Sequence, residues 1–340
     1  MILNLFAYLF FATVTALVLI QPSIWLSRRW GLIDDPSTAA HKIHRSPIPQ
    51  AGGLALFSTL VLGNLLAGTL RDAEILPILG SAAIIFGFGL WDDRKGLSAP
   101  WKFLGQILAV SILIANGVQV NFTGHQILNI AVTVFWVVGI TNAFNLVDSK
   151  DGLALGLAIL AAAFFTVVTH DAGQIFLARS NTVLLGACLA VFYFNAAPAR
   201  LFLGDSGAQL LGFLLASLAI AYTPPGLPQG SSWFVPILLL GVPIFDTTLV
   251  TVSRLRRGIN VFQGKRDHTY HRLVSLGVEP ARAVLTMHLS AGLLSCLAFI
   301  ALTLPPLWAN LVFALCLLTG LVTLLWLERR NPYQEDRREY

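Results

Sequence analysis

The sequence predicts an all-α integral membrane protein, a polytopic bundle of about eleven transmembrane helices. Of its 340 residues, 56% are hydrophobic and only 11% are charged, a composition that a water-soluble domain cannot cover with polar surface. The apolar residues also fall into uncharged runs long enough to cross the ~30 Å of hydrocarbon in a bilayer. In chain order, the expected spans are 2–26, 50–70, 75–91, 103–122, 124–144, 152–169, 181–198, 206–223, 231–252, 283–303 and 307–327.

The first run predicts a retained helix, because no basic segment precedes it and no cleavage site follows it. Assigning successive connections to alternate sides leaves Arg71 and Arg179 as the only basic residues on one side. The positive-inside rule then places the N-terminus outside and the C-terminus in the cytoplasm. Nearly all the aspartates fall on the same cytoplasmic side, although the rule largely ignores acids. We therefore expect a functional site on the cytoplasmic face.

The chain shows no repeat and no soluble segment, so we expect one membrane domain over residues 1–330 and a cytoplasmic tail over 331–340. The basic residues form no groove with interleaved aromatics, which argues against a nucleic-acid partner. The three cysteines lie inside apolar runs without metal-like spacing and are expected to be ordinary membrane-core residues. The loops expected to build the site are about 27–49, 92–102, 144–152, 198–205 and 253–282.

A polar stretch, N-A-F-N-L-V-D-S-K-D-G, interrupts two uncharged runs at residues 142–152. A carboxylate at the centre of a membrane helix costs about 2.5 to 3.5 kcal/mol, so such groups occur where they face water, a metal or a substrate. Asn142, Asn145, Asp148 and Asp151 recur every third residue and would share one side of a helix. That arrangement suits a cation or a polar ligand. The alternative is a polar helix end satisfied by neighbouring helices.

Two adjacent acids, Asp92 and Asp93, end another apolar run, and Lys102 opens the next. Adjacent carboxylates raise one another's pKa and suit a divalent metal or proton abstraction. Lys102 can hold a phosphate as a point charge. A solvated turn is the alternative for this segment.

Asp205 stands directly before an apolar run in F-L-G-D-S-G. It is either the N-cap of the following helix or a ligand for a hard metal such as Mg²⁺, which prefers oxygen donors and substrate phosphates.

A basic loop spans 254–272 and contains His268 and His271. Their spacing allows Zn²⁺ binding, but no third ligand accompanies them, and the basic density favours an anionic phosphate. An ordinary positive-inside loop is the alternative. An earlier loop ends in Gly52 and Gly53, which let the backbone come close to a ligand or another helix.

Taken together, these motifs resemble those of the polyprenyl-phosphate N-acetylhexosamine-1-phosphate transferases, over residues 30–275. The motifs that carry the resemblance are H-K-I-H-R-S-P-I-P-Q-A-G-G (41–53), G-L-W-D-D-R-K-G-L (89–97), N-A-F-N-L-V-D-S-K-D-G-L (142–153), F-L-G-D-S-G (202–207), P-I-F-D (243–246) and R-D-H-T-Y-H-R-L (266–273).

The resemblance implies an enzyme that transfers N-acetylhexosamine-1-phosphate from a UDP-sugar to undecaprenyl phosphate, releasing UMP. It implies Mg²⁺ as cofactor, with Mn²⁺ as a substitute, and a multi-pass location in the bacterial inner membrane with a cytoplasmic active site. The product would initiate a cell-envelope glycan such as O-antigen or teichoic acid. Homodimers are common in this superfamily.

The resemblance also assigns roles to individual positions. Asp92 and Asp93 match the Asp–Asp pair implicated in deprotonation of the lipid phosphate and in catalysis. Asn145 and Asp205 match positions that hold Mg²⁺. The positions carried over as substrate-binding are Lys102, Asp148, Asp151, Arg266, His268, His271, Arg272 and His44.

Three features depart from the family pattern. Ser149 stands where the family usually has Gly, Gln50 stands where Arg or Leu is common, and R-D-H-T-Y-H-R-L replaces a denser histidine motif. The triple-histidine segment of the phospho-MurNAc-pentapeptide transferases is missing, which favours a plain UDP-N-acetylhexosamine.

Both a direct attack by the lipid phosphate and a two-step route through Asp92 stay open. A secondary transporter would place its acids near the midplane and show repeats, and a non-catalytic lipid-binding homologue would lack acids that are present here.

Overall fold

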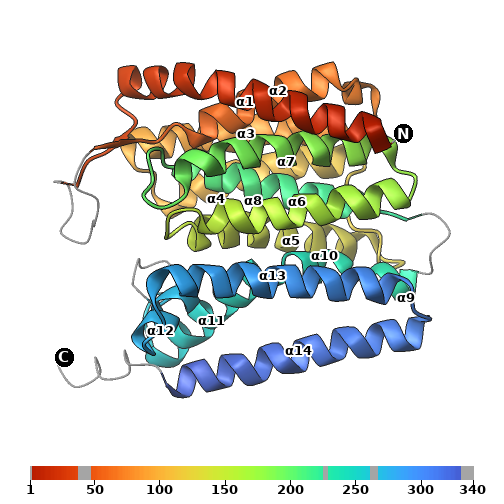
Figure 1. Ribbon diagram of the computed structural model, residues 1–340. Coiled ribbons are helices and arrows are strands. Elements are labelled where there is room, and N and C mark those ends of the chain that lie inside the picture. The colour runs from red at the N-terminus through yellow and green to blue at the C-terminus, as the bar shows by residue number, and fades with distance from the viewer. Residues whose placement is uncertain (1, 37–46, 225–228, 261–266, 331–340) are drawn as a thin grey trace. The chain divides into compact units, whose positions relative to one another are not determined.

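The computed structural model describes residues 2–36, 47–224, 229–260 and 267–330 and is almost entirely helical (Figure 1). Within these residues, eight helices are long and apolar enough to cross a membrane, and two shorter apolar helices accompany them. The predicted class, an all-α polytopic membrane protein, is confirmed. The chain divides into two compact units, Met1–Pro225 and Gly226–Tyr340, each described by itself below.

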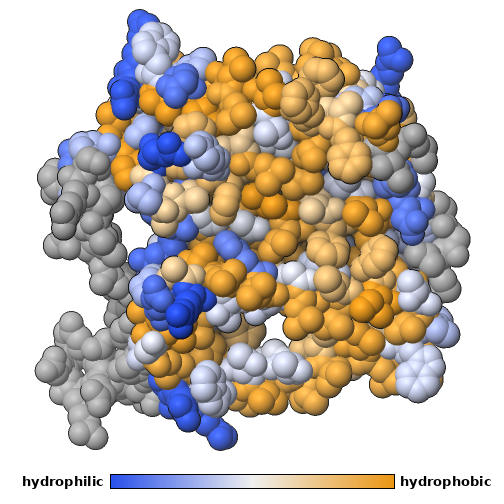
Figure 2. Space-filling model, viewed as in Figure 1, coloured by the Kyte–Doolittle hydropathy of each residue, from blue (hydrophilic) through white to orange (hydrophobic). Residues whose placement is uncertain are grey.

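The first unit is a bundle in which α7 packs on α1, α2 and α6, while α8 packs on α2, α3 and α5. Hydrophobic residues cover the middle of its helices, and hydrophilic residues gather near their ends (Figure 2). Its elements are α1 (Ile2–Trp30), β1 (Ile33–Asp34), β2 (Ile48–Pro49), α2 (Gly52–Leu66), the 3-10 helix η2 (Thr69–Arg71), α3 (Ile75–Lys95), α4 (Ala99–Ala115), α5 (Gln126–Val147), α6 (Leu153–Asp171), α7 (Ile175–Asn195) and α8 (Gly204–Ala221).

The second unit is built on two long apolar helices that lie side by side, α13 and α14. Both begin with a proline in the first turn, where the missing N–H has no intrahelical partner to lose. The elements are α9 (Gln229–Ser232), α10 (Val235–Leu239), α11 (Gly241–Arg257), α12 (Thr269–Ser275), α13 (Pro280–Leu302) and α14 (Pro306–Arg329).

All but one of the expected spans coincide with a single helix. The exception is 231–252, where the chain forms α9, α10 and α11 with a break at Leu240. Pro243 explains the break, because in a continuous helix its ring would clash with the carbonyl of Leu239. Hydropathy alone does not register this, since proline and glycine interrupt a helix without adding charge.

The entrances of α2 and α8 are held together through their backbones. Phe202 N donates to Pro49 O, Gly52 N donates to Phe202 O, and Gly53 N donates to Leu203 O, each at 3.0 Å. A Cβ on Gly52 would lie 2.8 Å from Leu203 Cα, so this approach requires glycine, as the sequence predicts.

Helix α3 makes an equally close approach to the first turn of α8. A Cβ on Gly89 would overlap Ser206 Cα and lie 2.8 Å from Ser206 N. Gly89 precedes Asp92 and Asp93 by about one turn, so the contact decides where the two carboxylates lie.

Gly89→Ala is expected to destabilise the protein and abolish its activity, because the new methyl group meets backbone that has no room to move. Overpacking typically costs about 1–3 kcal/mol. Gly87→Ala on the same helix is the matched control, since a Cβ there has no neighbour within 4 Å. Thermal unfolding in detergent compares the two, and equal melting temperatures would contradict the close contact.

Candidate functional site

Asp93 lies in the last turn of α3 and caps the N-terminus of α8. Its Oδ1 accepts from Asp205 N at 2.6 Å and its Oδ2 accepts from Ser206 N at 3.1 Å. Free N–H groups and the helix dipole both favour an anion at this position. Asp205 itself lies inside the first turn of α8, which begins at Gly204, so it is not the N-cap. Asp93 therefore fixes the helix that carries Asp205.

Lys102 links two carboxylates from different helices. Its Nζ donates to Asp205 Oδ2 at 2.7 Å and forms an ion pair with Asp92 Oδ2. Asn145 Nδ2 donates to Asp205 Oδ1 at 3.0 Å. Asp92 is 7% exposed, and its Oδ1 accepts from Leu97 N at 2.6 Å, so it does not lie in a solvated turn. Helices α3, α4, α5 and α8 thus each contribute one side chain to a single cluster.

The polar stretch after Asn145 is not helical throughout. Helix α5 ends at Val147, and Asp148 to Gly152 form a turn before α6. The expected helical period therefore holds for Asn142 and Asn145 and fails for the two aspartates. Asp151 Oδ2 instead accepts from Ala199 N at 3.0 Å, which ties the turn to the segment after α7.

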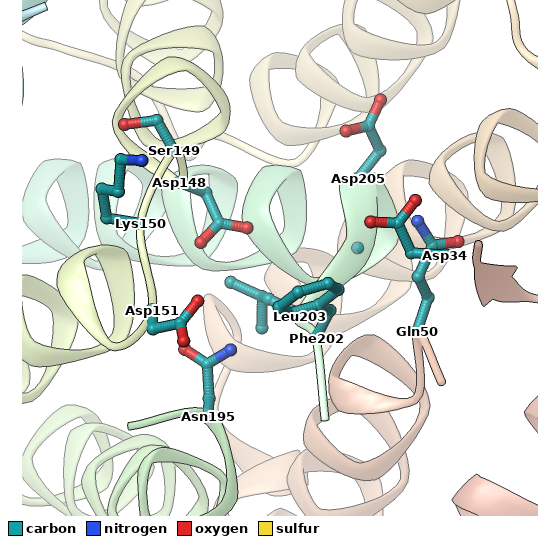
Figure 3. Close-up of a pocket in the computed structure, with 11 residues that line it drawn as sticks. Asp34, Gln50, Asp148, Ser149, Lys150, Asp151, Asn195, Phe202, Leu203 and Asp205 are labelled. Carbon is teal, nitrogen blue, oxygen red and sulfur yellow. The ribbon is translucent and has the colours of Figure 1, made fainter. Parts of the chain in front are cut away.

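A pocket of about 370 Å³ opens beside Asp205 (Figure 3). The turn after α5 forms one side of it, and Asp34 and Gln50 form the opposite side, with Phe202 between them. Among the described residues that line it, Phe202 carries the only aromatic side chain. The lining residues are Asp34, Gln50, Asp148, Ser149, Lys150, Asp151, Asn195, Phe202, Leu203, Gly204 and Asp205.

Four aspartates, Asp34, Asp148, Asp151 and Asp205, are among the described residues that line this pocket. Burial raises the pKa of the Asp148 carboxyl to about 8, and the neighbouring carboxylates act in the same direction. Below that pH the carboxyl holds a proton and can donate a hydrogen bond. Above that pH the carboxylate is negatively charged, and a nearby cation would stabilise it.

In the second unit, Asp246 of α11 is fully buried and holds the start of α12. His268 Nδ1 lies 2.9 Å from Asp246 Oδ2, and Thr269 N donates to Oδ1 at 2.6 Å. The carboxylate therefore fixes the orientation of the His268 ring. The ring of His271 lies 6.0 Å from that of His268.

Three buried ion pairs hold the same segment. Burial alone would raise the pKa of Asp267, but hydrogen bonds from Arg254 (2.7 and 3.1 Å) and Arg257 (2.7 Å) hold it below its usual value. Arg272 is 1% exposed, and its Nη1 donates to Glu328 Oε2 at 2.8 Å. Arg272 thus binds α14, and its predicted contact with substrate stays a prediction. The predicted residues His44 and Arg266 lie outside the described part of the chain.

Among the described residues, no three His, Cys, Asp or Glu side chains are grouped to hold a metal ion. The oxygen donors of Asp205, Asn145 and Asp92 nevertheless fit a hard divalent cation that takes its other ligands from phosphate and water. Lys102 Nζ lies between the two carboxylates. A cation bound between them requires Lys102 to move aside.

The predicted site residues did not include Asp34, Gln50, Asn195 or Phe202, although the loops expected to build the site, 27–49 and 198–205, contain Asp34 and Phe202. Asn195 is the last residue of the apolar helix α7, and its Oδ1 accepts a hydrogen bond from Gly152 N at 3.0 Å. A single amide at the end of an apolar helix is a sequence signal that could have identified it. Phe202 was within a quoted motif, but an aromatic residue between apolar neighbours carries no distinguishing sign.

Comparison with known proteins gives one family and a set of bacterial relatives. Residues 75–223 match the family "Glycosyl transferase family 4". A Bacillus subtilis protein described as a probable undecaprenyl-phosphate N-acetylglucosaminyl 1-phosphate transferase is 30% identical, over 89% of this chain and 86% of its own. A decaprenyl-phosphate N-acetylglucosaminephosphotransferase of Mycobacterium tuberculosis is 33% identical, over 93% and 87%.

A phospho-N-acetylmuramoyl-pentapeptide-transferase of Chlamydia muridarum is 31% identical over a smaller share, 62% of this chain and 73% of its own.

Arg272→Met is expected to lower the melting temperature, because it removes the ion pair with the Glu328 carboxylate, which is 2% exposed. Removing one member of a buried pair costs about 3–5 kcal/mol. Arg272→Met combined with Glu328→Met should recover most of the loss. Arg282→Met, which removes an exposed pair with Glu279, is the control and should change little. Equal effects of Arg272→Met and Arg282→Met would contradict the buried pair.

Proposed function

The chain belongs to glycosyl transferase family 4, the polyprenyl-phosphate N-acetylhexosamine-1-phosphate transferases, and we propose that it transfers N-acetylglucosamine-1-phosphate from UDP-N-acetylglucosamine to undecaprenyl phosphate. The choice of donor follows the relatives named for N-acetylglucosamine, which match most of the chain. The pentapeptide transferase matches a smaller part of it.

One observation carries this proposal. Lys102 links Asp92 and Asp205 at the ends of apolar helices, next to a pocket lined by acids and one aromatic ring. A phosphate joined to a lipid tail can reach this position from between the helices, and a nucleotide can reach it from water. The arrangement therefore suits two phosphate-bearing substrates that meet at the membrane boundary.

The reaction proceeds by direct attack of a lipid-phosphate oxygen on the phosphorus attached to the sugar. A P–O bond forms there, the bond from this phosphorus to the bridging oxygen breaks, and UMP leaves with the electron pair. Asp92 accepts the proton of the lipid phosphate, and the Lys102 ammonium contacts the phosphate oxygens. Asp93 holds the first turn of α8 in place. Such a site works mainly by positioning and electrostatics.

A magnesium ion held by Asp205 and Asn145 would supply positive charge to the diphosphate when bound. On the nucleotide side, Asp148 and Asp151 approach the uridine, and Phe202 offers a face on which a base can stack. In the second unit, Asp246 orients the His268 ring, and the predicted contact of His268 with the sugar-diphosphate stays a prediction.

The protein is a multi-pass membrane protein, and we place its reaction on the cytoplasmic face of the bacterial inner membrane. The product, undecaprenyl-diphospho-N-acetylglucosamine, would begin a cell-envelope glycan. A homodimer is part of the same proposal.

Purified protein in detergent is expected to release UMP only when undecaprenyl phosphate, Mg²⁺ and UDP-N-acetylglucosamine are all present. Asp92→Asn and Asp205→Asn should each lower kcat by about 100-fold or more, since each removes a charge from the reacting centre. Asp171→Asn, at the exposed end of α6, is the matched control and should leave kcat unchanged.

UDP-N-acetylgalactosamine and UDP-MurNAc-pentapeptide serve as competing donors in the same assay. UMP release from the pentapeptide donor alone would overturn the choice of donor. Absence of UMP with every donor, or release that survives both Asp substitutions, would overturn the proposed reaction.

A further inference from the structure

Three amide side chains form a second polar layer beneath the site in the first unit. Gln106 Nε2 donates to Gln209 Oε1 at 3.3 Å and to Asn142 Oδ1 at 3.4 Å. Asn142 Nδ2 donates back to Gln106 Oε1 at 2.8 Å and also bonds to Val138 O at 2.8 Å. Gln106 and Gln209 are 2% and 3% exposed, so the layer lies inside the bundle.

The layer repeats the site one helical turn deeper. Gln106 follows Lys102 by four residues on α4, and Gln209 follows Asp205 by four residues on α8. On α5, which reaches the site at its C-terminal end, Asn142 precedes Asn145 by three residues. Residues three or four apart lie above one another on a helix. The three helices that supply Lys102, Asn145 and Asp205 are therefore joined a second time by the amides.

Stability alone is a weak reason for amides at this depth. Burying an amide costs free energy that its hydrogen bonds only balance, and interhelical hydrogen bonds in membranes add little net stability. Apolar side chains of similar volume would pack the same space at less cost. Hydrogen bonds differ from apolar contacts in being directional, so they set the rotation and the axial shift of one helix against another.

We propose that Gln106, Asn142 and Gln209 are positioning residues that hold α4 in register with α5 and α8, so that Lys102 meets Asp205. The inference deepens the proposed function and rests on it for its kinetic test. A slip of one residue along α4 moves Lys102 by about 1.5 Å. That displacement is enough to break the 2.7 Å contact between Lys102 Nζ and Asp205 Oδ2. Misplacement by about 1 Å can cost about 100-fold in rate.

Gln106→Leu tests the layer, because it replaces the central amide with an apolar side chain of similar size. The expected result is a fall in kcat of about 10- to 100-fold, with KM for UDP-N-acetylglucosamine changed far less and the melting temperature kept. Asn129→Leu is the matched control. It removes another buried amide, bonded to Thr123, at the opposite end of α5. Its effect should fall on the melting temperature, with kcat per folded enzyme unchanged.

A pair of conservative variants keeps the test independent of folding defects. Gln106→Asn shortens the central side chain and should lower kcat. Adding Asn142→Gln restores the combined length across α4 and α5 and should recover much of the rate. Failure of the double variant to improve on Gln106→Asn would contradict a role in spacing.

A second measurement does not depend on catalysis. Acetylation of Lys102 by N-succinimidyl acetate, followed by mass spectrometry, reports whether its amine is held by the two carboxylates. The labelling rate should rise several-fold in Gln106→Leu and stay at the wild-type value in Asn129→Leu.

Unchanged labelling together with wild-type kcat in Gln106→Leu would overturn the positioning role, as would a loss of activity that only follows the loss of folded protein. If the wild-type protein releases no UMP, the proposed function has failed, and the labelling of Lys102 still decides the inference.

Discussion

The close approach of α3 to the first turn of α8 is the constraint on which the site depends. Gly89 leaves no side chain between the helices, so the backbone at Ser206 sits against α3. Only at that separation can Asp93 accept hydrogen bonds from two N–H groups of α8. The same geometry places Asp92 and Asp205 close enough to share Lys102. The absence of a side chain at Gly89 thus allows the charged side chains of α3 and α8 to come together.

The polar groups of the first unit are arranged in layers along its helices. Carboxylates and Lys102 form the layer at the boundary, and the amides around Gln106 form the next one. One turn deeper on α8, a Cβ on Gly212 would lie 2.7 Å from the carbonyl oxygen of Ile140, so α5 and α8 touch through backbone. Each layer fixes the helices in a different way, by charge, by directional hydrogen bonds and by close packing. The layers explain how apolar helices hold a charged cluster in place.

Composition and charge distribution predicted the all-α membrane class, because a membrane helix needs only a long enough run of apolar, uncharged residues. The lengths of the uncharged apolar runs predicted most helices. They did not predict the break at Leu240, because a proline interrupts a helix through a clash with one particular carbonyl. The motifs predicted that Asp92, Lys102, Asn145 and Asp205 belong to the site, and in the structure these side chains form one cluster of contacts. The sequence could not show that Asp93 caps α8 or that Arg272 pairs with Glu328, because both depend on helices far apart in the chain.

In the proposed reaction, the two phosphates meet at the cluster around Lys102. A cryo-EM structure of the protein in a lipid nanodisc with UDP-N-acetylglucosamine and Mg²⁺ tests it most directly. We expect an oxygen of the sugar-linked phosphate at about 3 Å from Lys102 Nζ, beside Asp205, with the uridine in the pocket next to Asp148. A diphosphate bound elsewhere, with Lys102 still paired to both carboxylates, would contradict it.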